Sequence, residues 1–217
     1  MSETFSCVLH PDFAELKESA TATVTSVARK CFEARIPRRQ RGKLPVASRM
    51  AGGIWQHYDL SRRLAMLDAD PKETPLLILN RYANWDYVAN MMCNDVAITL
   101  ESINSYVATA WFPASLQGYM TIEQGNRAEA LTLATKDIDM QTAAIEGLFL
   151  RNLQGEKVGA VVVGTFEAIP EKIGRHCIVH GKPVAFGAFS LISSQDSETA
   201  IIAALTIHQE LYHHDNQ

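Results

Sequence analysis

The stretch that decides the fold runs from Thr142 to Ile169 and reads TAAIEGLFLRNLQGEKVGAVVVGTFEAI. Two runs of large and β-branched apolar residues, 142–151 and 157–166, are separated by five residues that include Asn152 and Gly155. This pattern predicts an antiparallel hairpin. In the second run both alternating sets are apolar, which predicts a central strand covered on both faces; the sets are Val158, Ala160 and Val162 on one face and Val161 and Val163 on the other.

Composition and charge narrow the class of protein. The chain has 217 residues, of which 47% are hydrophobic and 20% charged, and its formal net charge is -4. These are ordinary globular values, and an acidic chain predicts no attraction to nucleic acid or to an anionic membrane surface. Met1–Thr4 lacks the basic start of a signal peptide, and no apolar run approaches the ~18 residues of a membrane span. Four scattered cysteines without a C-x-x-C pair predict reduced thiols and a cytoplasmic location.

The remaining patterns predict helices at both ends of the chain. Pro11 and a three-and-four spacing of apolar residues predict a helix to about residue 35, within a helical N-terminal segment 1–68. A second helix over 46–67 contains Gly52 and Gly53, so either it begins at Ile54 or its backbone approaches something closely. Apolar and alternating runs predict strands at 76–79, 106–112 and 119–123, and Asp196 or Ser197 caps a last helix within 196–214.

Together these elements predict one α+β domain. An antiparallel β-sheet of five to six strands occupies 75–192, and the N-terminal and C-terminal helices pack on it.

Several polar clusters are candidate sites of chemistry. Asp137 and Asp139 flank Ile138 and either bind a divalent cation or form a solvated turn, which we favour. His208 lies on the apolar stripe of the last helix, which indicates a packed core histidine, and no metal site is expected there. The basic loop Arg38 to Lys43 either holds a phosphate or an acidic partner or is a solvated connector, which we favour. His176, Cys177 and His180 form the tightest reactive-type cluster, but in a strand the two histidines share a face while Cys177 points the other way, which disfavours a Cys/His nucleophile pair.

The run from Ile145 to Gly164 resembles the late hairpin of GAF, PAS and Cache sensor domains. Those domains carry a small molecule over an antiparallel sheet, so the resemblance implies a small-molecule-binding sensor or regulatory domain with an apolar pocket. We expect no cofactor, no nucleic-acid or membrane partner, and a homodimer. Aromatic and methionine side chains are the candidates to line the pocket; they are Trp85, Tyr87, Met91, Trp111 and Phe149.

Two alternatives stay open. The glycine pair before a long helix resembles hotdog-type acyl-CoA thioesterases, in which a helix N-terminus polarises the thioester carbonyl; that resemblance implies roles for Gly53 and Asp59. The third interpretation is a non-enzymatic adaptor that dimerises through its N-terminal helix, in which Val24→Asp breaks the dimer. The sequence contains no G-x-S-x-G, Walker, H-E-x-x-H or G-x-G-x-x-G motif.

Overall fold

A seven-stranded mixed sheet forms the centre of the molecule. The computed structural model describes residues 2–41, 44–82, 112, 114–152, 159–168, 178–179, 182–183 and 185–212. The sheet has the order β3-β2-β1-β9-β6-β4-β5, in which β4 pairs in parallel with β5 and β6 and all other neighbours are antiparallel. Its strands are β1 (Glu3–Leu9), β2 (Phe13–Glu18), β3 (Thr23–Ala28), β4 (Leu76–Leu79), β5 (Ala130–Leu133), β6 (Ala160–Ala168) and β9 (Ala185–Ser193).

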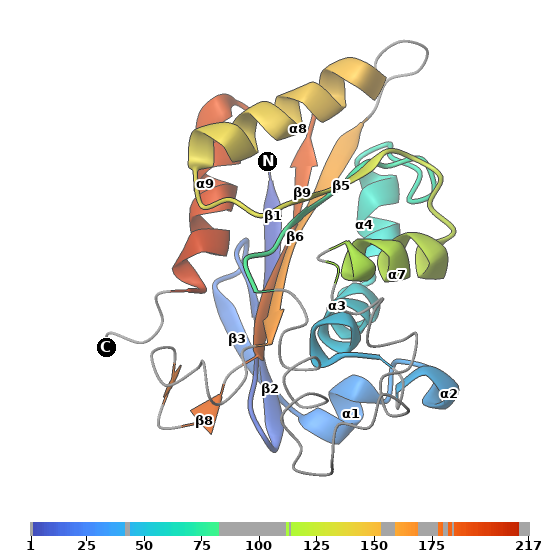
Figure 1. Cartoon of the computed structure of the whole chain (residues 1–217), viewed down its shortest axis with the longest axis vertical. Coiled ribbons are helices and arrows are strands. Elements are labelled where there is room, and N and C mark those ends of the chain that lie inside the picture. The colour runs from blue at the N-terminus through green and yellow to red at the C-terminus, as the bar shows by residue number, and fades with distance from the viewer. Residues whose placement is uncertain are drawn as a thin grey trace, which may run out of the picture.

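Helices cover both faces of this sheet (Figure 1). One face packs against α3 and α7, and the other packs against α8 and α9. A short antiparallel ribbon of β7 (Ile178–Val179) and β8 (Lys182–Pro183) stands apart from the main sheet. The helices are α1 (Arg29–Glu33), α2 (Arg38–Arg41), α3 (Val46–His57), α4 (Leu60–Met66), α7 (Ser115–Gln124), α8 (Ile138–Asn152) and α9 (Glu198–Glu210).

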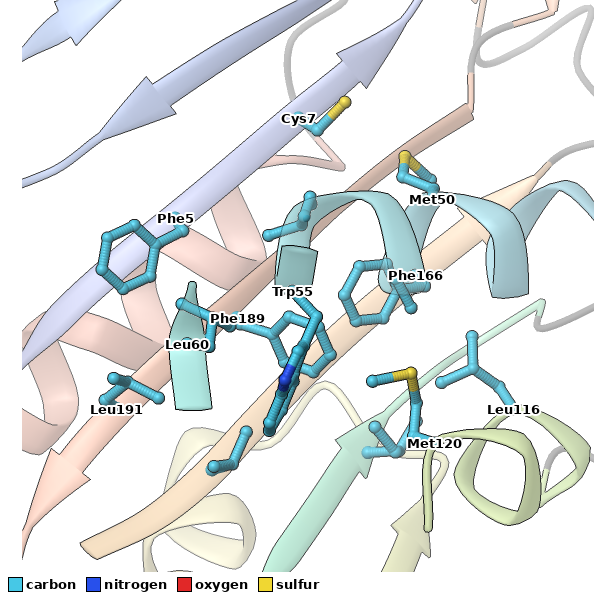
Figure 2. Packing of buried hydrophobic residues seen from close by; sticks show 14 of the residues in the cluster. Phe5, Cys7, Met50, Trp55, Leu60, Leu116, Met120, Phe166, Phe189 and Leu191 are labelled. Atoms are coloured by element: carbon cyan, nitrogen blue, oxygen red, sulfur yellow. The ribbon is translucent and has the colours of Figure 1, made fainter. Parts of the chain in front are cut away.

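The larger of the two cores lies between α3 and the sheet. Figure 2 shows Trp55 of α3 beside Phe166 and Phe189 of the central strands. The rings of Phe166 and Phe189 have centroids 4.6 Å apart, and those of Trp55 and Phe189 are 5.4 Å apart in an edge-to-face arrangement. Such pairs add to the free energy gained by burial alone, so this trio fixes how α3 sits on the sheet.

The central strand that the sequence predicts is confirmed. All nine residues of β6 are buried, and it pairs with β9 along its whole length and with β4 on its other side. Its two faces serve different cores, because Ala160 and Val162 pack toward α3 while Val161 and Val163 pack toward α8 and α9. Covering both faces of a strand is what allows it to be apolar throughout.

The predicted antiparallel sheet of five to six strands is corrected to a mixed sheet of seven, and the predicted hairpin is wrong. Residues 142–151 belong to α8, which turns Gln141, Ile145 and Leu148 inward at helical spacing. The Asp137 side chain accepts hydrogen bonds from the backbone N–H groups of Asp139 and Met140, as helix-capping residues do. The apolar face of a helix was therefore read as a strand.

The predicted N-terminal helix over 11–35 is also wrong. Residues 3–28 contain three antiparallel strands, and only the five-residue α1, which ends at Glu33, follows them. The segment is rich in Thr and Val, which favour a pleated strand. Ala14 and Leu16 point into the core while Glu15 and Lys17 face solvent. These residues therefore follow the two-residue period of a strand, although the apolar residues of the segment also fit the three-and-four spacing of a helix.

Of the other predicted helices and strands, some are confirmed and some are wrong. The strand at 76–79 and a C-terminal helix capped by Ser197 are confirmed. The helix predicted over 46–67 is two helices, because Asp59 takes a left-handed conformation (φ 48°) and caps α4. The strand predicted at 119–123 is wrong, since those residues belong to α7. The strand predicted at 106–112 lies outside the described residues apart from Phe112.

Candidate functional site

The structure separates the residues predicted for a thioesterase site. Gly53 lies inside α3, and a Cβ built on it would come within 2.5 Å of Cζ of Phe32. The close approach that the sequence offered as an alternative is therefore a packing contact with α1. Asp59 is exposed and its side chain accepts from the backbone N–H of Arg62, so it caps α4.

The pocket residues predicted from aromatic character can be placed only in part. Phe149 is half-buried on α8 and packs on the core shared with α9. The other four, Trp85, Tyr87, Met91 and Trp111, lie outside the described residues. Glu146 is exposed on α8, so its carboxylate faces water and does not line a pocket.

A chain of buried hydroxyl and imidazole groups crosses the sheet beneath α9. His208 of α9 is buried, with its Nε2 2.9 Å from Oγ of Ser190 in β9 and its Nδ1 2.8 Å from Oγ1 of Thr165 in β6. The Ser190 hydroxyl in turn lies 2.6 Å from Oγ1 of Thr4 in β1. The prediction of a hydrogen-bonded core histidine is confirmed, and the network ties one helix to three strands.

This network holds a neutral histidine. Desolvation by burial lowers the pKa of His208 to about 4. In the neutral ring one nitrogen donates and the other accepts, which suits a hydroxyl on either side. Ser190 next to a histidine has the outline of a nucleophile and its base, but Ser190 has no exposed surface and is held by Thr4 as well. Its hydroxyl therefore has no access to a substrate.

A second cluster surrounds the buried carboxylate of Glu167, near the end of β6. The hydroxyl of Tyr212 donates to Oε1 of Glu167 over 2.6 Å, and the backbone N–H groups of Arg81 and Tyr82 donate to the same carboxylate. Burial and the nearby Glu167 raise the pKa of Tyr212. The guanidinium carbon of Arg81 lies 3.8 Å from the centroid of the Tyr212 ring, a cation–π contact. This cluster links the segment after β4 to the residues after α9.

Between these clusters and the start of α8 lies a small polar hollow. It has room for about one water molecule. Gln141 of α8 donates from Nε2 to the backbone oxygen of Thr135 over 2.8 Å, while its Oε1 is buried and has no hydrogen-bond partner in the part of the chain that the structure describes. A buried acceptor without a partner costs free energy, so this oxygen is suited to receive a donor from outside the chain. The hollow is lined by Leu79, Arg81, Thr135, Gln141, His208 and Tyr212.

Sequence reasoning missed this hollow. The sequence predicts a solvated turn at Asp137 and Asp139 before a hairpin, and this prediction leaves Gln141 outside any helix. The signal that was available is Asp137, an N-cap residue four positions before Gln141 and eight before Ile145.

The cysteines within the described residues do not join this site. Cys7 is buried in β1, where desolvation and the nearby Glu15 raise the pKa of its thiol, and Cys31 is exposed on α1. Cys177, His176 and His180 lie outside the described residues, as does Cys93. Across the part of the chain that the structure describes, no three His, Cys, Asp or Glu side chains gather as metal ligands do. Asp137 caps α8 instead.

None of the described helices is long and apolar enough to cross a membrane.

Comparison with known proteins gives likeness in structure but not in sequence. No family model matches the chain, and no curated protein matches it. Among solved structures, a chain of the AntDE:AntF complex, a type II polyketide synthase acyl-carrier protein with its ketosynthase bound to the hexaketide, matches with a TM-score of 0.54 and 21% identity. That match covers 75% of this chain and 50% of the other, so it spans half of the relative's length.

A second solved structure matches along nearly its whole length. It is the complex of the ketosynthase ApeO with its chain length factor ApeC from Xenorhabdus doucetiae, with a TM-score of 0.53 and 16% identity. The match covers 98% of this chain and 92% of that chain. At these identities the likeness concerns the fold.

Proposed function

We propose that this chain is a non-catalytic subunit that binds a ketosynthase. The observation that carries the proposal is the near-complete match, over 98% of this chain and 92% of the other, to a chain from the complex of a ketosynthase with its chain length factor. The two solved structures described above are both complexes that contain a ketosynthase. A chain of this fold and length is therefore a candidate to act as a partner subunit.

The buried histidine network favours a role without catalysis. Acyl transfer through a covalent intermediate requires a nucleophile that the substrate can reach and a base beside it. Among the described residues, the serine beside His208 is closed off from solvent and Cys7 is buried with a raised thiol pKa. Cys31 is exposed, but it lies on α1, away from the polar hollow.

Copurification tests the partner directly. We would co-express the tagged chain with each ketosynthase encoded in its source genome and weigh the eluted species by native mass spectrometry. The expected result is a stoichiometric complex with one of them, in which ketosynthase activity depends on the chain. Failure of every ketosynthase to copurify would contradict the proposal.

Acylation tests the absence of catalysis. We would incubate the chain alone with acetyl-CoA and malonyl-CoA, then measure its intact mass and the release of free CoA. We expect no acyl adduct and no CoA release above the protein-free control. An acyl group on any residue of this chain, or turnover, would show that the subunit is itself an enzyme.

The second candidate is the small-molecule sensor, whose ligand would place one donor group in the polar hollow, because the hollow has room for about one water molecule. Gln141 lines this hollow, and its Oε1 has no hydrogen-bond partner among the described residues, so a donor on a ligand that reaches it would gain a hydrogen bond. A ligand that binds only the folded state raises the melting temperature in proportion to the logarithm of its concentration over Kd. We would screen a metabolite and acyl-CoA library by thermal shift against the wild type and Gln141→Met, which keeps the length of the side chain but lacks the oxygen. A sensor site at the hollow predicts a shift in the wild type that Gln141→Met loses.

The thioesterase interpretation is tested by the same incubation of the chain with acyl-CoA. A hotdog-type thioesterase predicts hydrolysis of acyl-CoA that disappears in Asp59→Ala, although Asp59 caps α4 and Gly53 faces Phe32. A cytoplasmic location is part of our proposal, supported by the free thiols of Cys7 and Cys31.

A further inference from the structure

The outer strand of the sheet, β3, presents unpaired backbone groups to solvent. It is the terminal strand in the sheet order, and in Figure 1 it lies at the margin of the sheet beside β2. Five of its six residues are exposed. An edge of this kind is a template for another strand, and proteins usually protect it with charged residues, proline, a bulge or a covering element. The sequence of β3, TVTSVA, contains no charge and no proline.

The register shows which groups are free. Arg29 donates its backbone N–H to the backbone oxygen of Asp12, so every second pair along the β2–β3 ladder is hydrogen-bonded in the same way. Thr23, Thr25 and Val27 therefore point their backbone groups toward β2. The backbone groups of Val24, Ser26 and Ala28 point outward, and within the described residues they meet no other strand.

Exposed apolar side chains accompany this edge. Val24 is 54% exposed and Phe13, on β2 opposite Ala28, is 37% exposed. Both lie on the face of the sheet away from Ala14 and Leu16, which pack into the core. The hairpin thus places two large apolar side chains beside an uncharged edge.

We propose that β3 pairs antiparallel with β3 of a second copy of this chain, about a two-fold axis that passes between the two Ser26 residues. Three outward residues centred on Ser26 form a self-complementary set. Ser26 meets Ser26, and Val24 meets Ala28 of the second copy, so all the outward N–H and C=O groups of the three residues are paired. A two-fold axis at any other residue of β3 would leave at least one of these three residues without a partner from the same set.

The same axis brings the exposed apolar side chains together. Val24 lies beside Ala28 of the second copy, and the next side chain along that row is Phe13 of the second copy, which can reach Val24 over the small alanine. The two Glu15 side chains are three strand spacings apart, about 14 Å, which is beyond the ~10 Å Debye length at 0.1 M salt. Charge therefore does not oppose the pairing. A contact made mainly by one strand is small, so the dimer is expected to depend on concentration.

Charge placed on the axis tests the pairing. We would measure the weight-average mass by sedimentation over a dilution series. The wild type is expected to rise from 24.0 kDa toward twice that mass with concentration. Ser26→Lys and Ser26→Glu each place like charges directly opposite one another, so each alone is expected to stay at 24.0 kDa. An equimolar mixture of the two variants pairs opposite charges and is expected to regain the wild-type mass.

Two further variants serve as a control for the added charge and as an independent test of the pairing. Ile122→Lys, on α7 and 82% exposed, adds the same charge elsewhere and is expected to dimerise as the wild type does. Ser26→Pro removes one outward N–H and no bond of the β2–β3 ladder, so it is expected to stay monomeric even where a charged variant fails to fold. A wild type that stays at 24.0 kDa at every concentration, a Ser26→Pro chain that dimerises, or folded charge variants whose mixture stays monomeric would overturn the proposal. This surface is independent of the ketosynthase proposal, because a homodimer does not require a ketosynthase.

Discussion

His208 combines full burial with a hydroxyl on each ring nitrogen. Ser190 and Thr165 satisfy the neutral ring, and among the described residues no carboxylate is hydrogen-bonded to it to stabilise its charged form. Desolvation therefore decides its protonation, and the pKa falls to about 4. The histidine acts as a structural link between α9 and the sheet and, by the same physics, as a weak point in acid.

We predict that acid destabilises the protein through His208. The unfolded chain takes up a proton near pH 6.5, whereas the folded chain resists until about pH 4. The stabilising contribution is therefore complete above pH 6.5 and is lost as the pH falls through this window, by about 3 kcal/mol in all. Urea unfolding at pH 7.5 and pH 4.5 measures the loss, and His208→Gln, which cannot gain a charge, should show a smaller difference. An equal difference in both proteins would contradict the assignment.

The position of some site residues could be predicted from the sequence, and that of others could not. His208 could be assigned to the core because it continues the spacing of Ile201 and Leu205. Its partners Ser190, Thr165 and Thr4 could not, because they come from three strands whose order depends on contacts far apart in the chain. Gln141 was missed because its segment was assigned the wrong secondary structure.

Elements were predictable where one pattern dominated. The run LLIL at 76–79 is too short for a helix and wholly apolar, so it predicts a buried strand. Ser197 caps α9, as its sequence position predicts. The failures lie where two periods fit the same residues. In 142–151, apolar residues satisfy both a strand and a helix, and the helix forms because Asp137 caps it and the sheet lies beneath Ile145 and Leu148. Local pattern alone does not reveal where the sheet lies.

The contact of α3 with α1 gives a prediction about glycines. Gly53→Ala should destabilise the protein by about 1–3 kcal/mol, because the added Cβ would lie 2.5 Å from the Phe32 ring in a full core. Gly118→Ala in α7 is the matched control, since nothing lies within 4 Å of its Cβ position. That change should stabilise by about 0.5–1 kcal/mol through helix propensity. Chemical denaturation of both variants measures the difference, and two changes of the same sign would contradict it.

At the scale of the whole molecule, the two described cysteines report on different motions. Cys31 is exposed, whereas Cys7 lies 1% exposed in the core, with a thiol whose pKa burial raises. A thiol reacts as its thiolate and only when a reagent can reach it. Cys7 can therefore react only when the sheet opens.

We predict that iodoacetamide labels Cys31 in the native protein and Cys7 only through unfolding. Peptide mass spectrometry separates the two sites. Labelling of Cys7 should accelerate with urea in step with the global unfolding transition, because it reports the fraction of open molecules. Labelling of Cys7 at the rate of Cys31 in buffer would show that β1 opens locally.

The pairing of β1 with β9 has a consequence for synthesis on the ribosome. β1 (Glu3–Leu9) bonds to β9 over 185–191, so the first strand of this sheet in chain order cannot pair on that side until the last strand has been translated. Until then the β1–β2–β3 hairpins have no strand on their inner side, so the growing chain is exposed to chaperones and proteases while the residues between β3 and β9 are translated. Fragments that stop short of residue 193 should accumulate as degraded or chaperone-bound material, whatever their intrinsic helix and hairpin content.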